Sequence, residues 1–125
     1  MAPTAKVSDV KDLPGRVVHG MGVREFVGEG NSMNLTALYI EIDPSGQAPR
    51  NHHKIAEEIA FVIQGSGTLE LDGVLHELRA GTIIYIPPGT NHHVIAGPDG
   101  LRVLALMTPP VNEKRDLHLS PLEKP

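Results

Sequence analysis

The sequence contains no cysteine and no tryptophan, and its only aromatic residues are two tyrosines and two phenylalanines. Without cysteine the chain forms neither a disulfide nor a thiolate metal site, so any bound metal must rest on histidine, carboxylate or amide side chains. No stretch approaches the roughly 18 unbroken apolar residues of a membrane span. The segment from Met1 to Lys6 lacks the apolar run of a secretory signal. We therefore expect a cytoplasmic protein that does not enter a membrane.

The charge balance is mildly acidic, with 11 Lys and Arg against 15 Asp and Glu and a net charge of −4. This balance offers no basic surface for a phosphate backbone, so we do not expect nucleic acid as a partner. A length of 125 residues suits one domain. We place it at residues 16–111, between an N-terminal arm (1–15) and a C-terminal segment (112–125) rich in charge and proline. A homodimer is expected to add burial to so small a domain.

Short apolar runs separated by Gly, Pro and Asp dominate the central region, a pattern typical of an all-β sandwich or barrel. The expected strands are 16–19, 24–27, 34–42, 58–64, 67–71, 74–78, 82–86, 92–95 and 101–108. Asp72-Gly73 lies between two alternating runs and predicts a two-residue hairpin turn. The runs 59–63 and 83–86 are apolar at every position, which predicts strands buried on both faces. Tyr39, Phe61, Tyr85 and Met107 are interpreted as core residues, with lining of a cavity as the alternative.

Two segments about forty residues apart each combine a turn with a pair of histidines. The first contains His52-His53 and, after a short bend, Glu58; the second contains Pro87-Pro88-Gly89 followed by His92-His93. One such pair alone is most often a solvated loop feature. Imidazole and carboxylate groups from both segments, directed into one barrel, would form a nitrogen and oxygen site suited to Fe, Mn, Ni, Cu or Zn. His93 should face away from His92, toward the surface or an interface.

These segments resemble the two motifs of the cupin superfamily. Glu58 and Gly65 have the spacing of the end of the first motif. The second motif is matched by Gly81, Pro87, Gly89 and His92, with Ala96 where an Asn is usual. The resemblance covers residues 44 to about 106. It implies a small single-domain, RmlC-like cupin with a conical double-stranded β-barrel (jelly roll), and a metal commonly held by three His and one Glu.

The first motif departs from the family pattern because no His-x-His can be written. Side chains alternate across a strand, so either Asn51 and His53 or His52 and Lys54 point inward. The first register gives the site Asn51, His53, Glu58 and His92. The second makes Lys54 a ligand, and a lysine at its ordinary pKa is protonated and repels a cation. We favour the first register; both provide two histidines and one carboxylate, with open positions for substrate or O₂.

The function expected from these residues is that of a small metal-dependent enzyme acting on a small molecule inside the barrel, by dioxygenase, isomerase or lyase-type chemistry. Glu58 would serve as metal ligand or as base, and an inward Lys54 as proton donor or Schiff-base amine. The main alternative is a non-catalytic cupin, with or without a metal, that binds a sugar or another metabolite. An inert dimeric scaffold is a third interpretation. The sequence favours the enzyme and leaves the substrate, metal and reaction open.

Overall fold

The computed structural model describes residues 3–112 and 117–119, and almost all regular structure in this part of the chain is β-strand. None of its helices has the length and apolarity needed to cross a membrane. The elements are η1 (Val10–Asp12), β1 (Gly15–Val18), β2 (Met21–Val27), β3 (Thr36–Ile42), β4 (Gln47–His53), β5 (Glu57–Leu71), β6 (Val74–Arg79), β7 (Ile83–Ile86), β8 (His92–Thr108) and β9 (Leu117–Leu119).

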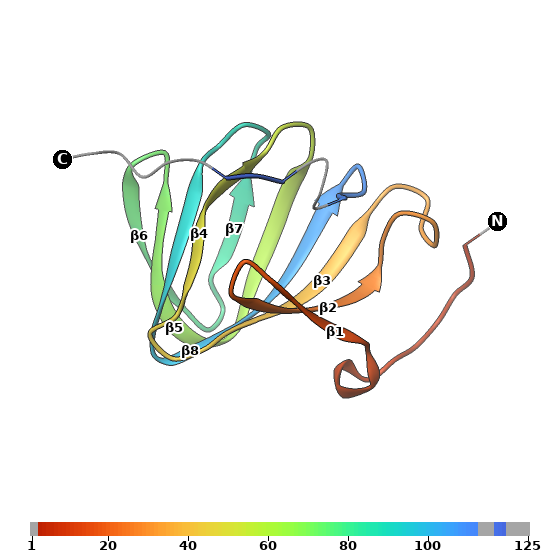
Figure 1. The fold of residues 1–125 in the computed structure, drawn as a ribbon, viewed down its shortest axis with the longest axis horizontal. Helices are drawn as coiled ribbons and strands as arrows, with labels where there is room; N and C mark the ends of the chain where they lie inside the picture. The colour runs from red at the N-terminus through yellow and green to blue at the C-terminus, as the bar shows by residue number, and fades with distance from the viewer. Residues whose placement is uncertain (1–2, 113–116, 120–125) are drawn as a thin grey trace.

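The strands form one continuous antiparallel sheet that folds over along the long strands β5 and β8, so that its two halves face each other as two sheets (Figure 1). In the first sheet, the first half of β5 pairs with the second half of β8. β7 pairs with the other edge of β5, and β3 pairs with the other edge of β8. β2 and β1 continue this sheet beyond β3. The second half of β5 and the first half of β8 form the other sheet with β6, β4 and β9. The chain therefore folds as the expected all-β jelly-roll barrel, with an interior bounded by both sheets.

The interior is filled by aliphatic side chains in two clusters. One is centred on Val62, Leu69 and Leu101, and the other on Val23, Ala105 and Met107. All six are almost completely buried. Because aromatic residues are scarce, branched aliphatic side chains and methionine provide the volume that a close-packed core requires.

The predicted hairpin at Asp72-Gly73 is confirmed. Leu71 pairs with Val74, and both turn residues have positive φ, 46° and 89°. Two such left-handed residues define the type I′ turn, whose twist matches that of the flanking strands. The hairpin joins β5 to β6 in the second sheet.

The strand boundaries differ from the expectation at the long strands. β5 and β8 run through the glycines at which the sequence predicted breaks. Gly65 has φ of +97°, and a Cβ there would lie 2.0 Å from the carbonyl oxygen of Gly100. The glycine therefore permits close approach of two backbones at a bulge instead of ending the strand. β4, which contains Pro49, and the short β9 are not among the expected strands, although the two alternative registers for residues 51–54 already assume an extended chain there.

The prediction that strands 59–63 and 83–86 are buried on both faces is wrong for the single chain. Their inward residues are buried or half-buried, but Ile59, Phe61, Ile63, Ile83 and Tyr85 retain between 42% and 70% of their accessible surface. Phe61 and Tyr85 are thus surface residues, and Tyr39 is only half-buried. Both apolar runs form strands, as predicted, but only one face of each strand packs against the interior of the barrel.

Candidate metal centre

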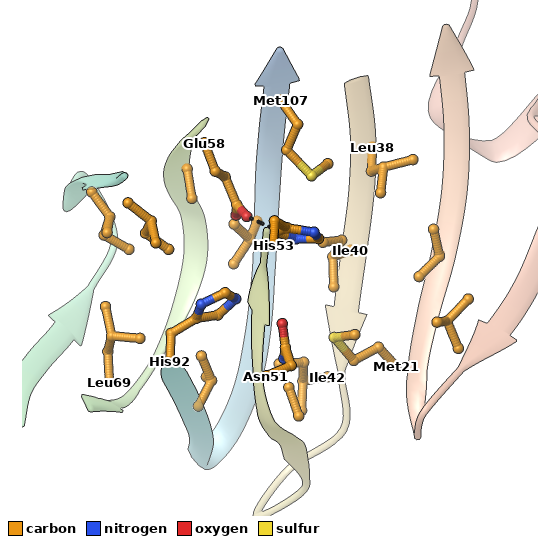
Figure 2. Close-up of a pocket in the computed structure, with 18 of the residues that line it drawn as sticks. Met21, Leu38, Ile40, Ile42, Asn51, His53, Glu58, Leu69, His92 and Met107 are labelled. Carbon is orange, nitrogen blue, oxygen red and sulfur yellow. Dashed lines mark ion pairs between the residues drawn. The ribbon is translucent and has the colours of Figure 1, made fainter. Parts of the chain in front are cut away.

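A cavity of about 110 Å³ lies between the two sheets. Aliphatic side chains and methionines form most of its wall, with contributions from β2, β3, β5, β7 and β8. Its polar lining consists of four side chains, two from β4, one from β5 and one from β8 (Figure 2). They are Asn51, His53, Glu58 and His92.

A β-bulge in β4 determines which histidine of the first pair faces the cavity. Ala48 pairs with Val94 and Asn51 with His92, so β4 has one residue more than β8 between these pairs. Alternation from Ala48 would otherwise direct residues 50 and 52 inward. The extra residue shifts the alternation and directs Asn51 and His53 into the cavity. The bulge lies at Pro49, which has no N–H to donate to the sheet.

The turn after β7 fixes the position of His92 and joins the two motifs. The N–H of Gly89 donates to the carbonyl oxygen of His53 at 2.8 Å, and Gly89 has φ of +82°, which glycine adopts without strain. At the start of β8, Nδ1 of His92 lies 3.1 Å from the carbonyl oxygen of Thr90. That contact assigns the proton to Nδ1 and leaves Nε2 as the lone-pair donor for a metal.

Burial favours the neutral, ligating form of His92. It lowers the pKa of His92, against a smaller opposite effect of the hydrogen bond to the Thr90 carbonyl. A neutral imidazole is the form that binds a metal ion. His92 can therefore act as a ligand near neutral pH without a large free-energy cost for releasing a proton.

Glu58 enters the cavity from the opposite sheet. It lies near the start of β5, paired with Ile86 and Met107. Burial raises the pKa of Glu58 from 4.5 to about 7, because an ionised carboxylate loses its hydration in apolar surroundings. Oε1 of Glu58 lies 3.6 Å from Nε2 of His53. A cation at this position would compensate the buried carboxylate.

His53, Glu58 and His92 each offer one ligand atom, and these atoms lie within 4.8 Å of one another. The rings of His53 and His92 are 5.9 Å apart between centroids. Two imidazoles and one carboxylate are donors that Fe, Mn, Ni, Cu and Zn accept, and three protein ligands leave coordination positions open. The residues present therefore fit a divalent metal. The amide of Asn51 is a further oxygen donor at the same wall (Figure 2).

The other sequence candidates lie outside the cavity lining. His52 is half-buried on the opposite face of β4, and Lys54 is exposed in the bend that follows. His93 points away from His92, and its Nε2 lies 3.0 Å from Oε1 of Gln47. Thr90, whose backbone carbonyl orients His92, was not predicted as a site residue. Its position two residues before His92 is the only signal of that role in the sequence.

The cupin-domain family model matches residues 38–108. The dimethylsulfoniopropionate lyase DddW of Ruegeria pomeroyi is 44% identical over 57 residues, which are 46% of this chain and 38% of that protein. The uncharacterized protein MJ1618 of Methanocaldococcus jannaschii is 35% identical over 75 residues, 58% of this chain and 60% of that protein. The chain thus spans less than two thirds of either relative.

Among solved structures, the polyketide cyclase RemF from Streptomyces resistomycificus superposes with a TM-score of 0.79 at 21% identity. The match covers 97% of this chain and 89% of that one. At this identity the likeness concerns the fold alone. The family match, by contrast, extends over more than half of the sequence and includes both histidine segments. The chain belongs to the cupin-domain family.

Proposed function

We propose that this protein is a metal-dependent enzyme that transforms a small molecule inside the barrel. The observation that carries the proposal is the convergence of His53, Glu58 and His92, from the two opposed sheets, inside a cavity whose lining is otherwise apolar except for Asn51. Apolar walls exclude water and strengthen electrostatic interactions at the reacting atoms. The narrow volume suits a small molecule and not a polymer.

In this proposal His53, Glu58 and His92 hold the ion, and Asn51 binds the ion or the substrate. A divalent metal supplies Lewis-acid polarisation of a substrate oxygen, or an anchor for O₂ if the ion is redox-active. The cavity lining within the described residues includes no lysine, arginine or tyrosine. Lys54 receives no role, because it is exposed outside the cavity.

Glu58 has two alternative roles, which exclude each other in a single step. As a carboxylate it is a metal ligand; as a group with a pKa of about 7 it is also suited to accept a proton from carbon near neutral pH. If Glu58 is the base, the ion rests on His53, His92 and Asn51. Glu58→Gln separates the two roles, because it removes the metal in the first case and only turnover in the second.

The similarity to DddW favours lyase chemistry as the reaction class. A direct experiment loads the protein separately with Fe(II), Mn(II), Ni(II) and Zn(II) and incubates it with dimethylsulfoniopropionate. Elimination would transfer a proton from the carbon next to the carboxylate to a base such as Glu58, form a carbon–carbon double bond and break the carbon–sulfur bond, which gives acrylate and dimethyl sulfide. We expect release with at least one metal, and none from metal-free protein or His92→Ala.

Lack of turnover by any loaded form, despite stoichiometric metal and saturable ligand binding, would favour the alternative of a non-catalytic metabolite-binding cupin. That alternative draws support from Asn51, which stands where the family commonly has a histidine. The cytoplasmic location and the domain boundaries at residues 16 and 111 remain predictions from the sequence.

Asn51→His is predicted to tighten metal binding. Asn51 is 95% buried and lies on the same face of β4 as His53, so a histidine there would add a third imidazole at the common spacing of two. An additional nitrogen ligand is expected to lower the dissociation constant by about tenfold or more. Calorimetric titration with Zn(II) measures the change. Unchanged or weaker binding by a folded variant would show that Asn51 is not positioned at the ion.

A further inference from the structure

The cavity is polar on one side and apolar on the other. Its four polar side chains come from β4, from the start of β5 and from the start of β8, whereas β2 and β3 contribute only aliphatic side chains and a methionine. In Figure 2, Met21, Leu38 and Ile40 lie together to the right of the polar side chains. The inner face of β2 and β3 is therefore an apolar wall next to the proposed metal site.

Strand register makes this apolar wall continuous. Val23 of β2 pairs with Ile40 of β3, and Ile40 pairs with Val103 of β8. All three side chains line the cavity. Neighbouring strands lie about 4.8 Å apart, so these side chains form one uninterrupted aliphatic row. Because each is branched at Cβ, its rotation is restricted and the wall has a fixed shape.

The apolar wall offers no hydrogen-bonding partner to a ligand. β3 lies between β2 and β8, and its backbone N–H and C=O groups are used in the two ladders. Within the described residues, the cavity lining includes no hydroxyl, lysine or arginine side chain. A hydroxyl, amide or charged group of a ligand placed against this wall would lose its hydration without compensation.

We propose that the cavity selects small molecules that have one oxygen-bearing head group and a short body of methyl and methylene groups without a further hydrogen-bonding group. The head group would lie at His53, Glu58 and His92, and the body against the inner face of β2 and β3. This inference rests on the proposed function, because the head group is bound through the ion at these residues. Sugars and other polyols do not fit, because their additional hydroxyl groups would lack partners.

The volume of the cavity limits the body to a few carbon atoms. An aliphatic cavity of ~150 Å³ in another protein accepts benzene. The cavity between the two sheets is smaller, at about 110 Å³. We therefore expect a body of about four or five carbon atoms beyond the head group.

Three compounds with the same head group and the same number of non-hydrogen atoms test this preference. Isocaproate ends in an isopropyl group, succinate in a second carboxylate and succinamate in an amide. Calorimetric titration of the Zn(II)-loaded wild type measures their dissociation constants. We expect isocaproate to bind at least ~10-fold more tightly than either of the other two, because only its end group needs no hydrogen-bonding partner.

Met21→Lys tests the position of the body by adding a cation to the apolar wall. Met21 is half-buried and packs against both aliphatic clusters. The variant is expected to lower the ratio of isocaproate to succinate affinity at least ~10-fold, because the ammonium group can pair with the second carboxylate of succinate. Met33→Lys is the matched control, because Met33 is 84% exposed and lies outside the cavity lining. It should leave the ratio unchanged, and circular dichroism verifies that both variants are folded.

Binding of succinate or succinamate within about twofold of isocaproate, or no detectable binding of isocaproate, would overturn the proposed substrate class. An unchanged ratio in a folded Met21→Lys variant would overturn the placement of the body against β2 and β3. Release of dimethyl sulfide in the assay above without the preference for isocaproate would refute the substrate class alone. The preference without any turnover would support the substrate class and favour the non-catalytic cupin.

Discussion

His92→Ala is expected to abolish stoichiometric metal binding while leaving the barrel folded. His92 is one of three side chains whose ligand atoms converge at the cavity wall. Loss of an outer-shell partner alone commonly weakens metal affinity by ~10- to 100-fold, so loss of a ligand should cost at least ~100-fold. His53→Ala should have the same effect. Elemental analysis of reconstituted protein and calorimetric titration measure both.

Each of these histidines has a neighbouring histidine that serves as its matched control. His93 directly follows His92, and His52 directly precedes His53. Both controls lie outside the cavity lining, on the opposite face of their strands. His93→Ala and His52→Ala are therefore expected to bind metal within about twofold of the wild type. Metal lost from His52→Ala but retained by His53→Ala would contradict the register that the bulge in β4 produces.

Glu58→Gln is expected to stabilise the metal-free protein and to impair metal binding if Glu58 is a ligand. In the folded chain burial raises the pKa of Glu58 from 4.5 to about 7. The folded state therefore holds this proton more tightly than the unfolded state. The stability associated with the neutral carboxyl is complete below pH ~4.5 and is lost as pH rises toward 7.

The expected gain from Glu58→Gln follows from that shift. A neutral amide avoids the cost of ionising a buried group, so the free energy of unfolding should rise by up to about 3 kcal/mol at pH 8 and by nothing at pH 4.5. Burial also lowers the pKa of His92, which decreases the free energy of unfolding as the pH falls. This contribution is the same in both proteins and cancels in the difference between them. Urea unfolding of both proteins at several pH values measures this difference in the free energy of unfolding.

At saturating metal, the wild type should instead have a larger free energy of unfolding than Glu58→Gln. Binding to the folded state alone stabilises the wild type by mass action, whereas Glu58→Gln should gain little if the carboxylate is a ligand. Glu77→Gln, an exposed carboxylate on β6, is the control and should change stability by less than about 0.5 kcal/mol at any pH. Equal destabilisation by Glu58→Gln at pH 4.5 and 8 would contradict the raised pKa.

Much of the fold could be predicted from the sequence because local signals agreed with it. Alternation and the Asp72-Gly73 turn identified the hairpin of β5 and β6, and the motif around Gly81, Pro87 and His92 identified the family. β4 was missed because Pro49 and its polar neighbours have a turn-like composition. This segment forms a strand because it pairs with β8, which is distant in the sequence.

The register of the site could be narrowed to two alternatives but not decided from the residues. Strict alternation cannot direct both Ala48 and Asn51 inward, yet both line the cavity. The bulge between them resolves this, and bulges have no reliable sequence signature. The exposed apolar residues of β5 and β7 were misinterpreted for a related reason: an apolar residue in a strand does not by itself indicate which face of the sheet it lies on.

Anomalous diffraction from crystals of Zn(II)-loaded protein tests the central claim most directly. The account predicts one strong peak per chain in the cavity, about 2.0–2.2 Å from a nitrogen of His53, a nitrogen of His92 and an oxygen of Glu58. No peak among these three side chains at saturating metal, or a peak held by His52 or Lys54 instead, would contradict it.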